Sequence, residues 1–248
     1  MCLLKVASHY FGFEVLELNT ILTSLVAGTI FLIGFLVSGV LSDYKESEKL
    51  PSELAACLYA LYDDIYTIFK SKQSAAALEF LYAHQIFTQS VMTWFYKKER
   101  TKHILNRIQE MNVFIIGMDV EGIQPNYIIK IKNEQNNLRK IFLRIDTIRD
   151  TTFVASAYVI VEFMSVLIGF CFLILKIEPF AASLFFAALV VFLLSYMIFL
   201  IKDLDNPFDY TLHGESGTEV SLLVLHNLEN EINSNLMTKL RSEVIERN

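Results

Sequence analysis

The sequence is poor in charged residues and in proline. Charged side chains make up 19% of the 248 residues, below the roughly 25% usual for globular domains. Only four residues are prolines, and 54% of the chain is hydrophobic. A disordered chain combines low hydrophobicity with high charge, so this composition argues against disorder. It also argues against a freely soluble enzyme, because the charge deficit is concentrated in three long apolar stretches.

The motifs of metal, redox and nucleotide chemistry are missing as well. The three cysteines, Cys2, Cys57 and Cys171, are too scattered for a CxxC site or a disulfide scaffold. The five histidines are isolated, and the sequence contains no HExxH, Walker A or GxGxxG motif. We therefore expect no enzyme activity, no metal and no cofactor. The net charge of −6 comes almost entirely from the last 47 residues, and no basic surface dominates, so we expect no nucleic-acid partner.

Long apolar runs are what the sequence does contain. Residues 21–41, 152–175 and 180–201 together hold 67 residues and a single charge, Glu162. About 20 apolar residues cross the hydrocarbon core of a bilayer as a helix. Each run reaches that length, and each is longer than the apolar part of a signal peptide. The sequence therefore predicts a multi-pass, all-α integral membrane protein whose partner is the lipid bilayer.

The regions between these runs have the charge of ordinary soluble protein and the periodicity of helices. In the tail, Leu225, Leu228, Ile232 and Leu236 form one apolar stripe at helical spacing. We expect this amphipathic helix to pack on the middle region or on a neighbouring subunit. The predicted organisation is an interfacial segment 1–20, transmembrane helix 21–42, a cytoplasmic helical region 43–151, transmembrane helices 152–175 and 180–201, and an acidic cytoplasmic tail 202–248.

Basic residues near the ends of the spans predict the orientation. Lys45 and Lys49 follow the first span, several arginines within 139–149 precede the second, and Lys202 follows the third. This places the middle region and the tail in the cytoplasm of a plasma (inner) membrane protein. A fourth span would arise if 75–96 inserted, but its polar residues favour a buried soluble helix.

An apolar pattern of seven residues leads from the middle region to the second span. Ile131, Leu138, Ile145 and Thr152 recur at this interval, and no helix breaker follows before the span begins. The pattern predicts one long helix that runs from the cytoplasm into the membrane.

Glu162 is the sharpest single candidate for function. It lies near the middle of the second span, where a carboxylate is costly unless it faces water, a partner group or another subunit. One interpretation is a pore-lining or proton-sensing group. The other is a protonated or hydrogen-bonded residue between packed helices. No basic residue lies inside any span, which favours water or a neutral carboxyl as the explanation.

Two further sets of residues point to packing and to a turn. Small residues at a spacing of four let helices approach closely, within the chain or between chains. The helix-packing candidates are Gly28, Gly34, Ser38, Ser165 and Gly169. After the third span comes an acidic turn that we expect to dock the tail: Asp203, Asp205, Asn206, Pro207 and Phe208. Its spacing fails the EF-hand pattern, so we do not predict a calcium site there.

Two blocks of the sequence resemble the bestrophin-like membrane proteins. The block GFLVSGVLSDYKESEKLP, 34–51, leaves the first span, and the block DLDNPF, 203–208, follows the last one. The Asn-Pro-Phe element is similar to the one that follows the last membrane helix in that family. The plan of spans flanking a cytoplasmic helical region is similar too.

The resemblance implies an all-α homo-oligomer, pentameric in true bestrophins, that surrounds a central pathway for inorganic ions. It implies a bestrophin-like ion channel, with anions as the expected ion. The acidic calcium-clasp run of the animal proteins is absent, which speaks against calcium gating. A carboxylate at Glu162 facing the pore would repel anions and favour cations, unless it is protonated. The alternative from another class is a non-conducting, membrane-anchored interaction or scaffold protein whose cytoplasmic helices bind a partner.

Overall fold

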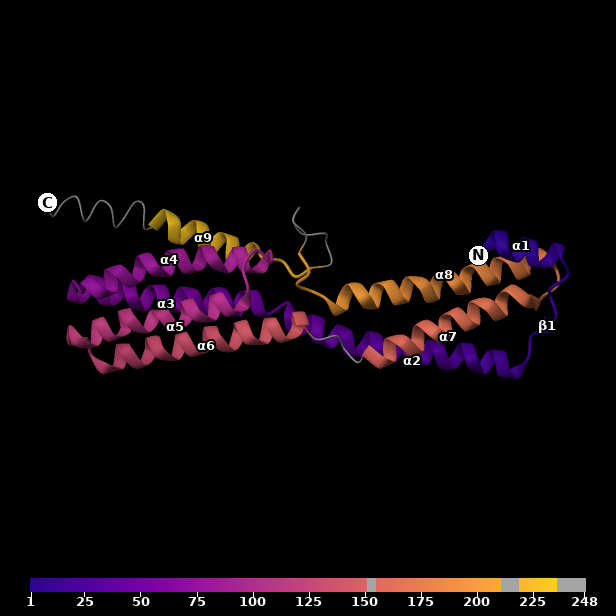
Figure 1. Cartoon of the computed structure of the whole chain (residues 1–248), viewed down its shortest axis with the longest axis horizontal. Coiled ribbons are helices and arrows are strands. Elements are labelled where there is room, and N and C mark those ends of the chain that lie inside the picture. Colours follow the sequence, from indigo (N-terminus) through magenta and orange to yellow (C-terminus); the bar gives the residue numbers. More distant parts are fainter. Residues whose placement is uncertain (151–154, 211–218, 236–248) are drawn as a thin grey trace. The chain divides into compact units, whose positions relative to one another are not determined.

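The computed structural model describes residues 1–150, 155–210 and 219–235. These residues are helical almost throughout, which confirms the predicted all-α class (Figure 1). The helices are α1 (Cys2–Tyr10), α2 (Thr20–Ser47), α3 (Leu50–Lys72), α4 (Ala75–Phe95), α5 (Thr101–Val120), α6 (Pro125–Asp150), α7 (Ala155–Ile174), α8 (Phe180–Asp205) and α9 (Leu223–Asn235). Two short strands, β1 (Leu16–Glu17) and β2 (Leu175–Lys176), complete the described elements.

The chain folds into two compact units, each made of two separate stretches of sequence. The span unit comprises residues 1–44 and 152–206, and the bundle unit comprises residues 45–151 and 207–248. The span unit contains nearly all of α2 together with α1, α7 and α8. The bundle unit contains α3 to α6 and α9.

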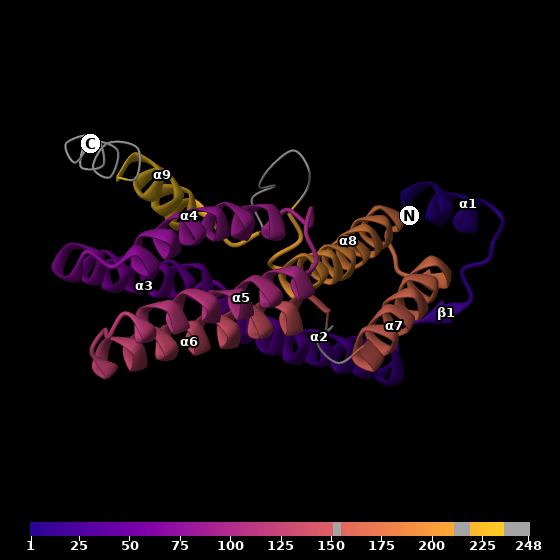
Figure 2. The same ribbon diagram turned by 60° about the vertical axis from the view of Figure 1, so that its left-hand side comes forward.

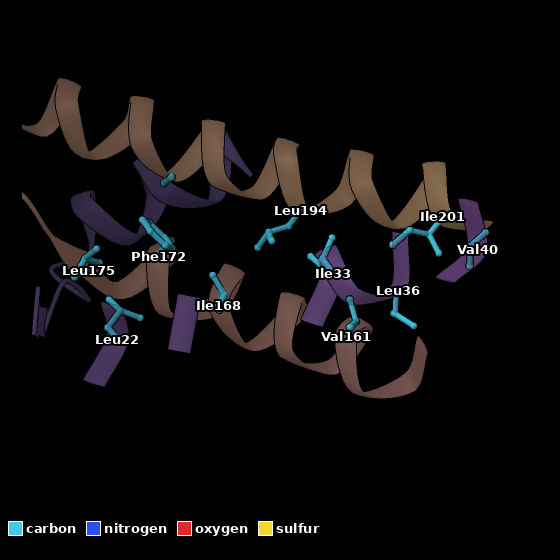
Figure 3. Packing of buried hydrophobic residues seen from close by; sticks show 11 residues of the cluster. Leu22, Ile33, Leu36, Val40, Val161, Ile168, Phe172, Leu175, Leu194 and Ile201 are labelled. Carbon is cyan, nitrogen blue, oxygen red and sulfur yellow. The ribbon is translucent and has the colours of Figure 1, made fainter. Parts of the chain in front are cut away.

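In the span unit, the three long apolar helices share one cluster of buried side chains (Figure 3). Leu36 comes from α2, Val161 and Ile168 from α7, and Leu194 and Ile201 from α8. Asn19 begins α2, because its side-chain oxygen accepts the Leu22 N–H at 2.9 Å and so caps the helix. Many large apolar residues on the outer faces of these helices stay exposed, as expected for helices that contact lipid.

Three described helices are long and apolar enough to cross a membrane. Helices α2 and α8 contain the first and third apolar runs, and α7 covers residues 155–174 of the second. The third run continues as helix to Asp205, four residues beyond the predicted end of the span. The predicted continuity between α6 and α7 depends on residues 151–154, which lie outside the described residues. Helix α4 covers residues 75–95 of the fourth candidate, 75–96, and belongs to the bundle unit, where Phe80, His84 and Trp94 are buried.

In the bundle unit, α3, α4, α5 and α6 lie side by side as antiparallel neighbours (Figures 1 and 2). Ser74 caps α4 by accepting the Ala77 N–H at 3.0 Å. Gly122, with a φ of 77°, ends α5 in the left-handed conformation that glycine adopts without strain. The heptad residues Ile131, Leu138 and Ile145 are fully buried, so the apolar stripe of α6 faces the core of this unit.

The amphipathic tail helix α9 packs along α3 and α4 of the same chain. Its apolar residues Leu225, Leu228 and Ile232 are buried. The amide of Gln85 on α4 donates a hydrogen bond of 2.8 Å to the Asn233 side chain on α9. Of the two partners that the sequence allowed, the structure thus shows the middle region.

Candidate functional site on the hairpin of α7 and α8

Glu162 on α7 forms an ion pair with Lys202 on α8. The Lys202 Nζ lies 2.5 Å from Glu162 Oε1, and the two side chains are 50% and 43% exposed. The pair joins two residues that are 40 positions apart in sequence, within the antiparallel hairpin of the span unit. Lys202 lies in the last turn of α8, and a lysine near a helix end can extend its flexible stem to reach a charge deeper along the hairpin.

The pair changes the interpretation of Glu162. From the sequence, the carboxylate had no basic partner inside a span, which suggested water or a neutral carboxyl. In the structure the basic partner comes from the flank of the next span. An unpaired charge inside a bilayer is costly, and such residues usually pair with one another. Lys202 thus places a positive group beside the Glu162 carboxylate on α7, which the sequence alone left without a basic partner.

A groove of about 330 Å³ lies beside this ion pair between α7 and α8. Its polar groups are Glu162, Ser165 and Ser195, and the rest of its lining is aliphatic apart from Gly169. The Ser165 Oγ is buried and has no hydrogen-bond partner among the residues that the structure describes. The groove therefore offers one carboxylate, one unused hydroxyl and an apolar wall on a face of the span unit.

The helix-packing candidates on α7 and on α2 differ in how closely another helix approaches them. A Cβ built on Gly169 would lie 3.7 Å from Val191 Cγ2, so this position touches α8 at ordinary van der Waals distance. A Cβ built on Gly28 or Gly34 would meet no described atom within 4 Å. Ser38 is exposed as well. No other helix of the described chain therefore approaches α2 closely at these positions. Contact with a helix of another chain remains the hypothesis.

The predicted tail-docking turn divides between the two units. Asp203 and Asp205 lie in the last turn of α8, and Asn206 ends that helix. Pro207 and Phe208 are buried in the bundle unit.

Phe208 is held in an aromatic cluster of that unit. Its ring centroid lies 6.1 Å from that of Phe95. The Pro207 carbonyl accepts the Val220 N–H at 3.0 Å, and the Tyr210 hydroxyl donates to the Val220 carbonyl at 2.6 Å. These contacts lead the chain from the third span to α9.

No group of three or more metal-ligating side chains occurs within residues 1–150, 155–210 and 219–235. Asp209, the third aspartate of the acidic segment, forms an ion pair with Lys97 at the end of α4. The carboxylates of this segment therefore do not converge on one point.

Sequence reasoning missed a buried charge cluster at the other end of the hairpin. Lys5 on α1 is completely buried, 2.6 Å from Glu14, and also donates to the Leu173 carbonyl at 3.3 Å. His9 contacts the same carboxylate at 2.7 Å. Burial opposes ionisation of Glu14, but the hydrogen bonds and positive charges of His9 and Lys5 outweigh it and lower the pKa of that carboxyl.

This cluster, which we call the N-terminal clasp, fixes the start of the chain to the end of α7. The Lys5 ammonium lies at the C-terminal carbonyls of α7, where the helix dipole favours a positive charge. Beside it, β1 and β2 pair in parallel with Leu16 opposite Leu175. Lys5 is buried, whereas the apolar residues Leu3 and Leu4 of the same helix are exposed.

Neither a protein-family model nor a curated protein matches the chain. Solved structures do match it. A bacterial bestrophin homologue from Klebsiella pneumoniae, solved by zinc SAD phasing, superposes with a TM-score of 0.77 over 93% of this chain and 94% of that chain, at 12% sequence identity. The chain has the bestrophin fold.

Two further crystal structures agree with the bestrophin fold. A variant of the Klebsiella pneumoniae homologue with one substitution gives a TM-score of 0.76 at 12% identity, over 93% of this chain and 94% of that one. A structure described only as a membrane protein with one substitution gives 0.72 at 14% identity, over 96% and 93%. The resemblance predicted from two short sequence blocks is thus confirmed for the fold over nearly the whole chain. With three apolar helices and the bestrophin fold, the chain is a membrane protein.

Proposed function

We propose that this protein is a homo-oligomeric ion channel that conducts anions. The bestrophin fold over more than nine-tenths of the chain is the observation that carries the proposal. Within the described residues, the span unit of one copy has only three long apolar helices, which cannot enclose a water-filled path by themselves. A channel of this fold therefore requires several copies. Several copies around an axis can enclose such a path, and a pentamer is the number that the resemblance implies.

The exposed side of α2 supports assembly between copies. Gly28, Gly34 and Ser38 are exposed and leave room for the close approach of another helix. Beside them Phe31 and Phe35 are exposed large apolar residues. A neighbouring subunit that packed here would bury these rings against a surface of small residues.

The ion pair removes the main electrostatic objection to anions. An unpaired Glu162 carboxylate at a pore would repel chloride in a low-dielectric environment. The Lys202 ammonium, 2.5 Å from Glu162, cancels that charge. The paired residues Glu162 and Lys202 are therefore compatible with anion conduction. In this proposal, the balance between their opposite charges sets the ion preference.

The proposed location is the plasma (inner) membrane, with the bundle unit and the tail in the cytoplasm. Lys45 and Lys49, directly after the first span, and the basic residues of α6 before the second support this orientation. A protease added to sealed vesicles of known orientation would test it.

The decisive experiment is ion flux from liposomes that contain the purified full-length protein. We expect chloride flux well above that of empty liposomes. Glu162→Gln leaves Lys202 uncompensated and should raise the ratio of chloride to potassium permeability. Lys202→Met leaves Glu162 uncompensated and should lower that ratio. Glu178→Gln, which removes an exposed carboxylate from the turn of the same hairpin, is the matched control and should change little.

Two results would contradict the proposal. Wild-type protein without flux above empty liposomes, in either a chloride or a potassium gradient, excludes conduction. If instead both charge variants shift the permeability ratio in the same direction, the balance assigned to Glu162 and Lys202 is wrong although conduction stands.

A second candidate function is a non-conducting, membrane-anchored interaction protein. The observation in its favour is a mainly apolar groove of about 310 Å³ between α4 and α5 of the bundle unit, with two charged residues in its lining. The lining consists of Ala83, Ile86, Phe87, Arg107, Glu110, Met111, Val113 and Phe114. Exposed apolar surface of this kind is typical of binding sites. The mass of the protein in mild detergent distinguishes the two functions. A central pore needs a ring of at least three copies, whereas an anchored interaction protein can be a monomer or dimer.

A further inference from the structure

The loop between α4 and α5 carries a dense group of charges at one end of the bundle unit. Residues 96–103 read Tyr-Lys-Lys-Glu-Arg-Thr-Lys-His and contain four lysines or arginines and one acid. Helix α4 ends before this loop in a left-handed residue, Lys97, with a φ of 56°. The Lys98 N–H returns to the Thr93 carbonyl at 3.0 Å and closes the helix end.

Some of these charges are neutralised within the bundle unit. Lys97 forms an ion pair with Asp209. Glu99, whose side chain is largely buried, lies 3.1 Å from the Arg107 guanidinium and 3.9 Å from the His103 ring. The only carboxylate of the loop is thus already paired with a basic residue of α5.

Three cations remain in excess. Lys98, Arg100 and Lys102 are exposed, and no ion pair joins any of them to another described residue. Lys102 also lies in the first turn of α5, which contains no acidic residue. Basic side chains there add to the positive end of the helix dipole instead of compensating it. We call these three residues the basic loop.

A short segment of chain tethers the basic loop to the end of a membrane span. Helix α8 has 26 residues, about 39 Å of helix, whereas the hydrocarbon core is about 30 Å thick. Its charged end, Lys202 to Asp205, therefore belongs at headgroup level. Asp209 follows Asp205 by four residues, which reach at most about 14 Å, and Asp209 pairs with Lys97 of the loop. That reach is of the same order as the Debye length of about 8–10 Å.

The connections between the bundle unit and the spans leave the bundle at the end that carries the basic loop. Glu46, near the end of α2, forms a bidentate pair with Arg144 on α6 at 2.8 Å. Arg149, at the end of α6, lies 4.9 Å from the Trp94 ring on α4. The first, second and third spans are therefore all joined covalently to the end of the bundle that carries the basic loop.

We propose that the basic loop binds the headgroups of anionic lipids. Positive charges beside a membrane-spanning segment attract an anionic leaflet, and each contributes roughly a fivefold gain in affinity near the surface. The basic loop suits an anionic membrane surface because its side chains are positive and exposed, and because a short segment connects it to the span. It acts as a headgroup contact of the bundle unit, separate from the ion pair on α7 and independent of whether the protein conducts.

The test measures lipid binding by the delipidated, full-length protein in mild detergent. The probes are phosphatidylglycerol and phosphatidylcholine with identical acyl chains, titrated and counted by native mass spectrometry. We expect the wild type to prefer phosphatidylglycerol, and we expect the double variant Lys98→Gln/Arg100→Gln to lose that preference by roughly 10- to 30-fold. The matched control Lys70→Gln/Lys72→Gln removes two lysines at the end of α3 and should stay within about twofold of the wild type.

Several outcomes overturn the proposal. One is a phosphatidylglycerol preference that the loop variant retains within twofold, and another is a wild-type preference that does not weaken as salt is raised. A third is a loop variant whose lipid preference is unchanged but whose oligomeric mass falls, which would identify an acidic segment of a neighbouring copy as the partner. Unchanged Trp94 emission verifies that the variant is folded.

Discussion

A buried histidine in the bundle unit predicts how the stability of that unit depends on pH. His84 on α4 is completely buried, with its ring centroid 6.1 Å from that of Tyr62. Neither ring nitrogen has a hydrogen-bond partner among the described residues. Burial disfavours the charged ring and lowers the pKa of His84 to about 4. The change that tests this is His84→Leu, which removes the titration and keeps an apolar side chain.

The sign and size of the change in unfolding free energy with pH follow from proton linkage. In the unfolded chain the ring has a pKa near 6.5, so below that pH the unfolded state binds a proton that the folded state does not. The folded state of the wild type therefore loses stability as the pH falls from about 7 to about 4. Between pH 7.5 and 4.5 the contribution of His84 to this loss is about 2.5 kcal/mol.

Trp94 provides the assay because it is the only tryptophan and is buried on the same helix. Denaturant unfolding of the full-length protein in detergent, followed by its fluorescence, gives the free energy of unfolding at pH 7.5 and 4.5. The loss on acidification should be about 2.5 kcal/mol smaller in His84→Leu than in the wild type. His103→Leu, at an exposed histidine of the same unit, is the control and should behave like the wild type. Equal losses in wild type and His84→Leu would refute the reasoning.

Two other substitutions test the packing contacts. Lys5→Met removes the buried ammonium and leaves Glu14 with only His9 of its two basic partners, which should cost about 3 kcal/mol and expose the first 20 residues to limited proteolysis. Lys176→Met at the exposed hairpin turn should have neither effect. Phe208→Ala empties a fully buried site and should cost about 3–5 kcal/mol by Trp94 unfolding. Because Phe199 is exposed, Phe199→Ala should leave that transition unchanged, and a similar loss in both phenylalanine variants would contradict the docking of the turn.

The spans could be predicted because hydropathy is a local property of the chain. A run of about 20 apolar residues has few alternatives to a membrane helix, so the three spans and the all-α class followed from composition and length. The stripe of Leu225, Leu228 and Ile232 likewise predicted an amphipathic α9. The helix that it packs against could not be chosen, because an apolar face does not specify its partner.

The candidate site could be predicted only in part, because its contacts join distant residues. Glu162 stood out as the one charge in three apolar runs, but its partner Lys202 was counted as a flank of the next span. Only the relative position of α7 and α8 brings the two together. Lys5, in contrast, did not stand out in the sequence at all. Nothing local indicates that a lysine is buried, since burial requires the Glu14 carboxylate and the carbonyls at the end of α7.

The interleaving of the two units constrains how the chain is made. Helix α2 ends at Ser47, yet α7, which shares its buried cluster, begins 108 residues later at Ala155. At 5–20 residues per second, the first span waits roughly 5–20 s in the membrane before its partners are synthesised. The contiguous helices α3 to α6 emerge during that interval and can associate first. A chain released after Asp150 should therefore carry an assembled four-helix bundle behind a single unpaired span.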